Sequence, residues 1–149
     1  MRAVIQRVDS AGVKIDKKEV SSIKSGILIF LGVEKGDCEA DADYILDKAV
    51  NLRIFEDSEA KMNRSLIDID GEMLVVSQFT LLADCRKGRR PSFENAEAPQ
   101  KAERLYNYFI NRAQDKNKKT AAGKFQEMME IELINNGPVT ILLDSRKNI

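Results

Sequence analysis

A nearly continuous apolar stretch is the feature that most limits what this chain can fold into. Residues 26–33 read GILIFLGV, which is far shorter than the roughly 20 residues that a membrane-spanning helix needs. The stretch also lacks the alternation of polar and apolar residues that marks a strand with one face in water. It therefore predicts a strand that is buried on both faces.

Two segments carry apolar residues at helical spacing, and both predict amphipathic helices. In the second segment, Pro99 suits the first helical turn. Acidic residues gather in and before the first segment, where they favour the positive end of a helix dipole, and no metal or substrate role is needed to explain them. The two apolar sets are Ala42, Ile45, Leu46, Ala49 and Val50, and then Ala102, Leu105, Tyr106, Phe109, Ile110 and Ala113.

The remaining apolar segments predict strands. These are residues 3–8, a hairpin of 13–15 and 19–23, a short strand 52–55, a long strand 73–82, and a pair 129–134 and 139–144 joined at 135–138. Hairpin connections favour antiparallel or mixed pairing, so the predicted fold class is α+β with two flanking helices. A length of 149 residues is expected to form a single domain, 1–149.

Composition excludes several kinds of chemistry. The chain has no histidine, which removes the serine and cysteine triads, histidine zinc motifs and any imidazole base. The two cysteines, Cys38 and Cys85, form neither a CxxC motif nor a disulfide framework, so we expect a reducing cytoplasm and no bound metal or other cofactor. Because 24 basic residues balance 24 acidic ones, a nucleic acid could be held only by a local patch.

Polar residues interrupt the long predicted strand at Ser77-Gln78-Phe79-Thr80. Strand alternation would place Ser77 and Phe79 on one face and Gln78 and Thr80 on the other. A strand end with satisfied hydroxyls would explain the segment. Alternatively, a strand irregularity there exposes backbone N–H groups that stabilise an oxyanion. A nucleophilic hydroxyl is the weaker hypothesis, because no histidine is available as its base.

Two basic clusters fit contact with a phosphate backbone, although charge runs are usually solvated. The first is the run Arg86-Lys87-Gly88-Arg89-Arg90. The second holds Arg112, Lys116, Lys118, Lys119 and Lys124.

Three further features each have a plain and a functional interpretation. Arg7 falls on the apolar face of the first strand, where a charge is unusual. Asn136-Gly137-Pro138 predicts a turn, although a cis Gly-Pro could project carbonyl groups at a ligand. Phe125 with the nearby Met129 could pack in the core or form a slot for a flat base.

Taken together, these segments resemble the D-aminoacyl-tRNA deacylase family, also called D-tyrosyl-tRNA deacylase. The resemblance extends over nearly the whole chain, and Ser-Gln-Phe-Thr followed by Asn-x-Gly-Pro-Val-Thr is its most specific part. The matching segments are 1–8, 61–66, 76–81, 88–93 and 136–140.

The resemblance implies a compact β-barrel-like core, a homodimer and hydrolysis of the ester between a D-amino acid and the 3′-terminal adenosine of tRNA. Residues 77–80 then form one wall of the active site. Gly137 and Pro138 match a cis dipeptide that enters the partner's pocket and excludes L-amino acids, and Arg7 matches the arginine that holds it. Phe125 and Met129 match the adenosine pocket, where Gln126 and Glu127 replace two small residues of the family pattern.

Elementary chemistry agrees with this resemblance, because an aminoacyl ester is already activated and needs no strong base. We expect backbone N–H groups near Gln78 and Phe79 to bind the oxyanion, while the 2′-hydroxyl of the tRNA assists the attacking water. Thr80 is expected to contribute to the positioning and polarity of the site and not to covalent catalysis. Chiral selection by main-chain atoms predicts tolerance of many D-amino acids, and of glycine. Three alternatives stay open: a tRNA-binding module without catalysis, an editing domain for L-amino acids, and a purely structural oligomer.

Overall fold

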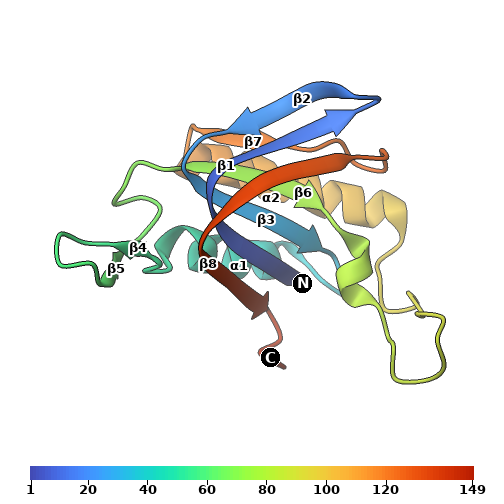
Figure 1. Cartoon of the computed structure of the whole chain (residues 1–149). Coiled ribbons are helices and arrows are strands. Elements are labelled where there is room, and N and C mark those ends of the chain that lie inside the picture. Colours follow the sequence, from blue (N-terminus) through green and yellow to red (C-terminus); the bar gives the residue numbers. More distant parts are fainter.

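The predicted buried strand lies in the middle of the main sheet (Figure 1). In the computed structural model, which describes residues 1–149, strand β3 (Gly26–Gly32) is buried everywhere except at Phe30. It pairs antiparallel with β1 (Arg2–Ile15) and parallel with β6 (Glu72–Ser77). The prediction from residues 26–33 is confirmed.

The main sheet has six strands in the order β2-β1-β3-β6-β7, and β8 pairs with the other side of β1. The outer strands are β2 (Lys18–Ile23), β7 (Thr120–Ala122) and β8 (Glu130–Asp144). β1 contacts three neighbours because it is long and curved, so the mixed sheet closes into a nearly complete barrel (Figure 1). The predicted α+β class with a barrel-like core is confirmed.

Two helices pack against one side of this sheet (Figure 1). They are α1 (Glu39–Asn51) and α2 (Pro99–Lys116), which begins with proline as predicted. Their apolar stripes join strands β1, β3 and β6 in a core of 22 buried residues. Neither helix is long and apolar enough to cross a membrane.

The long predicted strand 73–82 is wrong beyond Ser77. β6 ends there, and residues Phe79–Leu82 form a 3₁₀ turn, η1. The Gln78 amide still donates to the Leu31 carbonyl at 2.8 Å. The chain then bends across Gly32, where a Cβ atom would lie 2.9 Å from the Gln78 carbonyl oxygen. This close approach ends the strand.

The predicted strand pair 129–134 and 139–144 is one continuous strand, β8, and not a hairpin. Both halves pair antiparallel with β1. Gln6 pairs with Thr140 while Val8 pairs with Asn135, so β8 has more residues than β1 between these two points. The surplus forms a bulge, and Asn136-Gly137-Pro138 lies in it.

The short elements were predicted less well. The hairpin at 13–23 is confirmed, with Asp16 and Lys17 at positive φ in its turn. The strand predicted at 52–55 contributes only Phe55, since β4 (Phe55–Glu56) pairs with β5 (Met62–Arg64). Strands β5 and β7 were not predicted because both are only three residues long.

Candidate active site

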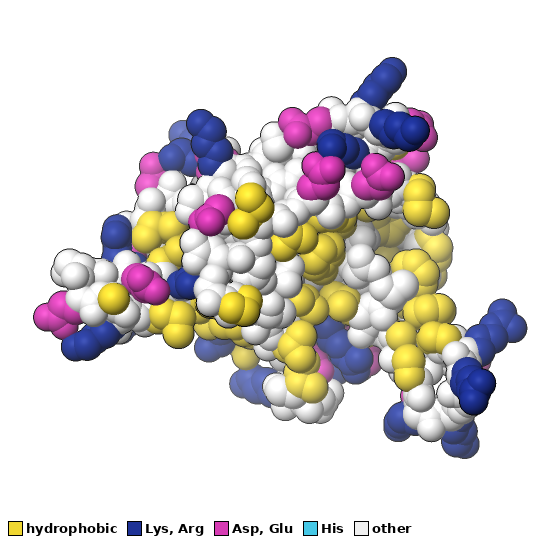
Figure 2. Space-filling view, viewed as in Figure 1, with side chains coloured by type: hydrophobic (Ala, Val, Ile, Leu, Met, Phe, Trp, Pro, Cys, Tyr) yellow, Lys and Arg dark blue, Asp and Glu magenta, His cyan; other side chains and the backbone are white.

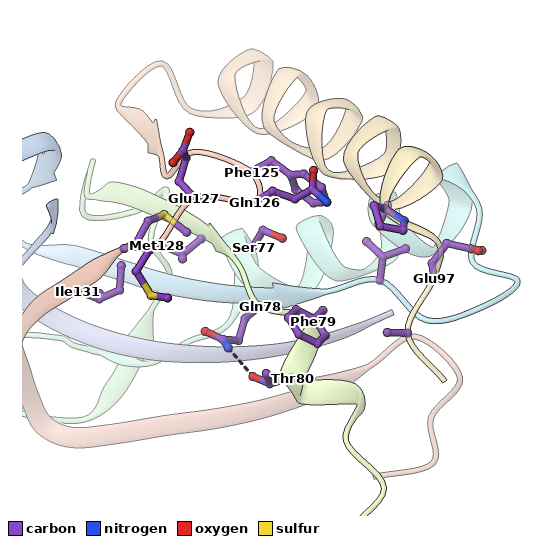
Figure 3. A pocket seen from close by; sticks show the side chains of 16 residues that line it. Ser77, Gln78, Phe79, Thr80, Glu97, Phe125, Gln126, Glu127, Met128 and Ile131 are labelled. Atoms are coloured by element: carbon purple, nitrogen blue, oxygen red, sulfur yellow. Dashed lines mark hydrogen bonds between the residues drawn. The ribbon is translucent and has the colours of Figure 1, made fainter. Parts of the chain in front are cut away.

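A cavity of about 770 Å³ opens where strand β6 ends. Most of its lining comes from three segments that are distant in sequence: residues 76–80, residues 96–102 around the start of α2, and residues 125–131 (Figure 3). Val33 completes the lining. The structure therefore brings Ser77, Gln78, Phe79 and Thr80 together with Phe125 and Met129. A space of this size, lined mainly by apolar atoms with a few polar groups, has the character of a ligand site.

The wall made by residues 77–80 leaves the strand after Ser77, yet it keeps Gln78 and Thr80 on one side, as strand alternation predicted. Because the chain bends at Gln78, the side chains of Gln78 and Thr80 approach each other, and the Gln78 amide nitrogen donates to the Thr80 hydroxyl (Figure 3). The phenyl ring of Phe79 is 56% exposed at the opening. The 3₁₀ turn begins at Phe79, and the first N–H groups of a helical turn have no acceptor within it.

The opposite wall lies beneath α2 (Figure 3). The ring of Phe125 packs against Tyr106, with centroids 5.9 Å apart. Burial raises the pKa of the Tyr106 hydroxyl, so this group stays neutral and donates to the Val75 carbonyl at 2.8 Å. This bond ties α2, and with it the Phe125 wall, to strand β6.

The segment after Phe125 also lines the cavity. Gln126 adopts a left-handed conformation, with φ of 61°. Met128 is 89% exposed, whereas Met129 is half-buried against Gly123, where a Cβ atom would lie 2.8 Å from the Met129 sulfur. A glycine at 123 is what leaves room for the Met129 side chain.

Glu97 is a lining residue that sequence reasoning missed. Lys101 donates to its carboxylate at 2.7 Å, and the amides of Ala98 and Gly36 donate at 2.9 Å and 3.2 Å. These bonds, with Lys101 the largest contributor, lower the pKa of Glu97 to about 2. The spacing of Glu97 and Lys101 was visible in the sequence, but only the fold places them at the cavity.

Arg7 lies away from this cavity and forms hydrogen bonds to the β8 bulge. Its side chain is only 8% exposed. Nε donates to the Asn136 carbonyl at 3.0 Å, and Nη1 donates to the Ile54 carbonyl at 2.5 Å. A buried guanidinium with these acceptors explains a charge on an apolar face.

The Gly137–Pro138 peptide bond, which follows the Asn136 carbonyl bound by Arg7, is cis. Gly137 has φ of +129°, which favours glycine, and a Cβ atom there would lie 2.8 Å from the Arg7 guanidinium. Both residues are exposed, and neither lines the 770 Å³ cavity of the same chain. The structure therefore separates Arg7, Gly137 and Pro138 from the wall formed by residues 77–80.

The first basic cluster lies on the loop between η1 and α2. Arg86 is bound to Asp84 there, while Lys87, Arg89 and Arg90 are exposed. The loop adjoins the cavity through Phe93, whose ring meets Phe79 edge-on at 5.1 Å.

Comparison with known proteins gives this site its context. The family model described as D-Tyr-tRNA(Tyr) deacylase matches residues 4–144. D-aminoacyl-tRNA deacylases of Syntrophus aciditrophicus and Clostridioides difficile are 61% and 55% identical, each over 99% of both chains. The fold and these relatives define the chain as an enzyme, a hydrolase of the deacylase class.

The chain belongs to the D-Tyr-tRNA(Tyr) deacylase family. Two solved structures share its fold. One described as c-Myc DNA Unwinding Element Binding Protein is 37% identical, with a TM-score of 0.92 over 97% of this chain and 98% of the other. A probable eukaryotic D-amino acid tRNA deacylase shares the fold at 16% identity, with a TM-score of 0.80 over 95% and 97% of the two chains.

Proposed function

We propose that this enzyme hydrolyses the ester between a D-amino acid and the 3′-terminal adenosine of tRNA, as a chiral proofreading step of translation in the cytoplasm. One observation carries the proposal: the cavity at the end of β6 gathers the family-matching residues 77–80, Phe125 and Met129 from distant parts of the chain. Glycyl-tRNA is expected as a side substrate, because glycine has no side chain to exclude.

Catalysis at this site rests on position and backbone donors. The backbone N–H of Gln78, one of the two expected oxyanion donors, already donates to the Leu31 carbonyl. The oxyanion is therefore assigned to the backbone N–H groups of Phe79 and Thr80, at the start of the 3₁₀ turn. Water attacks the ester carbonyl carbon, the 2′-hydroxyl of the terminal ribose assists, and the ribose 3′-oxygen leaves. Thr80, whose hydroxyl accepts from the Gln78 side chain, orients the site and forms no covalent intermediate.

Adenosine binding is assigned to the Phe125 wall. A purine stacks favourably on an aromatic face, and the flexible thioether of Met129 fills the space beside it. Gln126 and Glu127 stand at the same wall and replace the small residues of the family pattern, so they are the positions where this enzyme's adenosine contacts differ.

Chiral selection is assigned to Gly137 and Pro138 of a second copy of the chain. Arg7 holds the bulge rigidly, yet the dipeptide is exposed and absent from its own cavity. Exposed apolar side chains on β8, Ile134 at 59% and Leu142 at 60%, support the pairing of two copies along this strand. A homodimer then completes each site with the partner's dipeptide.

The test is to incubate the enzyme with D-tyrosyl-tRNA and with L-tyrosyl-tRNA and to measure ester loss from each. Rapid loss of the D ester with the L ester spared is the expected result. Loss of both would leave an esterase without the Gly137-Pro138 filter, and loss of the L ester alone would make the chain an editing domain. If both esters persist while tRNA binds, the chain is a binding module without catalysis.

A further inference from the structure

The loop between η1 and α2 projects from the body of the molecule and carries a cluster of cations (Figures 1 and 2). We define the basic loop as residues 84–92. Its two ends are joined by backbone bonds between Asp84 and Ser92, at 2.7 Å and 3.0 Å. The tip is open, since Gly88 has φ of +68° and a Cβ atom there would meet nothing within 4 Å.

The cations of the basic loop are not equivalent. Asp84 binds Arg86 through both carboxylate oxygens, at 2.9 Å to Nε and 2.6 Å to Nη2, so the charge of Arg86 is compensated within the loop. Lys87, Arg89 and Arg90 are exposed and form no ion pair. Three positive charges therefore stand uncompensated at one end of an electrically neutral protein.

The second basic cluster, around the end of α2, is different. Arg112 pairs with Asp43 and Asp115, at 3.3 Å and 3.8 Å. Lys116 pairs with Asp47 of α1 at 3.7 Å, and Lys119 pairs with Asp70, in the loop before β6, at 2.6 Å. Surface carboxylates thus pair three of the five cations of this cluster and leave Lys118 and Lys124 unpaired. The basic loop keeps three unpaired cations within four residues, so it is the stronger attractor for an anion.

The position of the basic loop relates it to the substrate. Phe93, just beyond the loop, meets Phe79 at the cavity opening with ring planes at 68°. The ester of an aminoacyl-tRNA is separated from the nearest phosphate, the 5′-phosphate of the terminal adenosine, by one ribose. An ester held at residues 77–80 therefore keeps the first phosphates of the acceptor end within a short distance of the cavity opening, and the basic loop begins beside that opening.

We propose that the basic loop is a phosphate-binding arm for the tRNA acceptor end, in which Lys87, Arg89 and Arg90 contact the backbone and Arg86 fixes the loop through Asp84. The inference rests on the proposed function for its substrate. Phosphate contacts read no base sequence, so the arm serves every tRNA alike and leaves chirality to the cavity.

The first test compares two substrates that share the ester and differ in phosphates. The triple variant Lys87→Ala/Arg89→Ala/Arg90→Ala is assayed on D-tyrosyl-tRNA and on 3′-O-D-tyrosyl adenosine, which has no phosphate. We expect kcat/KM on the tRNA to fall at least tenfold and kcat/KM on the adenosine ester to stay within twofold of wild type. An equal fall of kcat/KM on both substrates, or no fall on either, would contradict the proposal that the loop binds phosphates.

Two matched variants make the comparison specific. Lys116→Ala/Lys118→Ala/Lys119→Ala removes the same number of charges from the α2 cluster and is expected to retain activity on tRNA. Lys87→Arg/Arg89→Lys/Arg90→Lys keeps every charge of the arm and is expected to behave as wild type. A fall in the α2 variant equal to that in the loop variant would show that net charge, and not the loop, attracts tRNA.

Salt dependence tests the arm without any hydrolysis. Binding of uncharged tRNA weakens with salt in proportion to the phosphates contacted, with a slope of about −0.7 per contact on a single strand. The slope is that of the logarithm of the binding constant against the logarithm of the salt concentration, and losing three contacts makes it less negative by about 2. The ratio of the wild-type binding constant to that of the triple variant should therefore fall about sixteenfold between roughly 50 and 200 mM salt. An unchanged slope contradicts the arm, whereas failure of the wild type to hydrolyse either ester contradicts only the proposed function.

Discussion

This enzyme has two apolar clusters, which differ in size and in their position relative to the cavity. The larger one, of 22 buried residues, lies between the sheet and helices α1 and α2. The smaller one, of seven buried residues including Val8, Leu74 and Val76, packs against the half-buried Met129 and Ile131 that line the cavity. Most of the larger cluster lies away from the cavity and reaches it only at Val33 and Ala102, whereas the smaller cluster runs along the cavity wall at Val76. A substitution deep in the larger cluster should therefore affect folding, and a substitution at the cavity wall should affect catalysis.

The largest effect is expected from the larger cluster. Phe109 is a fully buried residue of α2. Phe109→Ala is expected to lower the free energy of unfolding by about 3–5 kcal/mol through lost burial and a residual cavity. Urea titration followed by circular dichroism measures this change. The exposed neighbour Asn107→Ala serves as the control and should change the stability little. A Phe109→Ala variant as stable as wild type would show that the larger cluster does not dominate folding.

The next effect concerns the bulge that Arg7 holds. Arg7→Lys removes the fork that reaches both the Asn136 and Ile54 carbonyls, because lysine offers a single point of donation. We expect the ratio of D- to L-tyrosyl-tRNA hydrolysis to fall at least tenfold, with a loss of about 1–3 kcal/mol in stability for the unpaired carbonyl. Arg53→Lys, at an exposed arginine, is the control. Unchanged selectivity in the Arg7→Lys variant would separate the bulge from the chiral filter.

A smaller effect belongs to the cavity wall. Phe125→Ala removes the aromatic wall, and stacking of a base on an aromatic ring contributes about 1–3 kcal/mol. KM for 3′-O-D-tyrosyl adenosine should therefore rise about tenfold, since 1.4 kcal/mol is a factor of ten, while kcat and the unfolding midpoint change less. A fall in kcat at constant KM would place Phe125 with the reacting atoms and not with the adenosine.

The smallest effect comes from the pH dependence of Glu97. Its folded-state pKa of about 2 lies below the ordinary 4.5, so its stabilisation is present above pH 4.5 and is lost as the pH falls towards 2. The difference in melting temperature between wild type and Glu97→Gln should be constant from pH 7 to about 4.5 and shrink below it. A difference that grows on acidification would show that Lys101 does not stabilise the carboxylate.

Much of the fold was determined by the sequence alone, because burial imposes local periods that survive in any single chain. The run 26–33 and the two helical stripes predicted β3, α1 and α2, since each element must hide its own apolar face. The family resemblance predicted residues 77–80 and Phe125 as parts of one site, and all five residues line one cavity.

Only the tertiary structure decided where strands end and which charges are free. The sequence pattern of a strand continues past Ser77, yet the chain turns there into a 3₁₀ turn, and the absence of a side chain at Gly32 leaves room for the Gln78 carbonyl. The β8 bulge depends on its register with β1. Asp43, Asp47 and Asp70 lie against three cations of the α2 cluster, whereas Asp84 pairs only with Arg86 in the basic loop. These features arise from contacts between residues far apart in sequence, and no local pattern encodes such contacts.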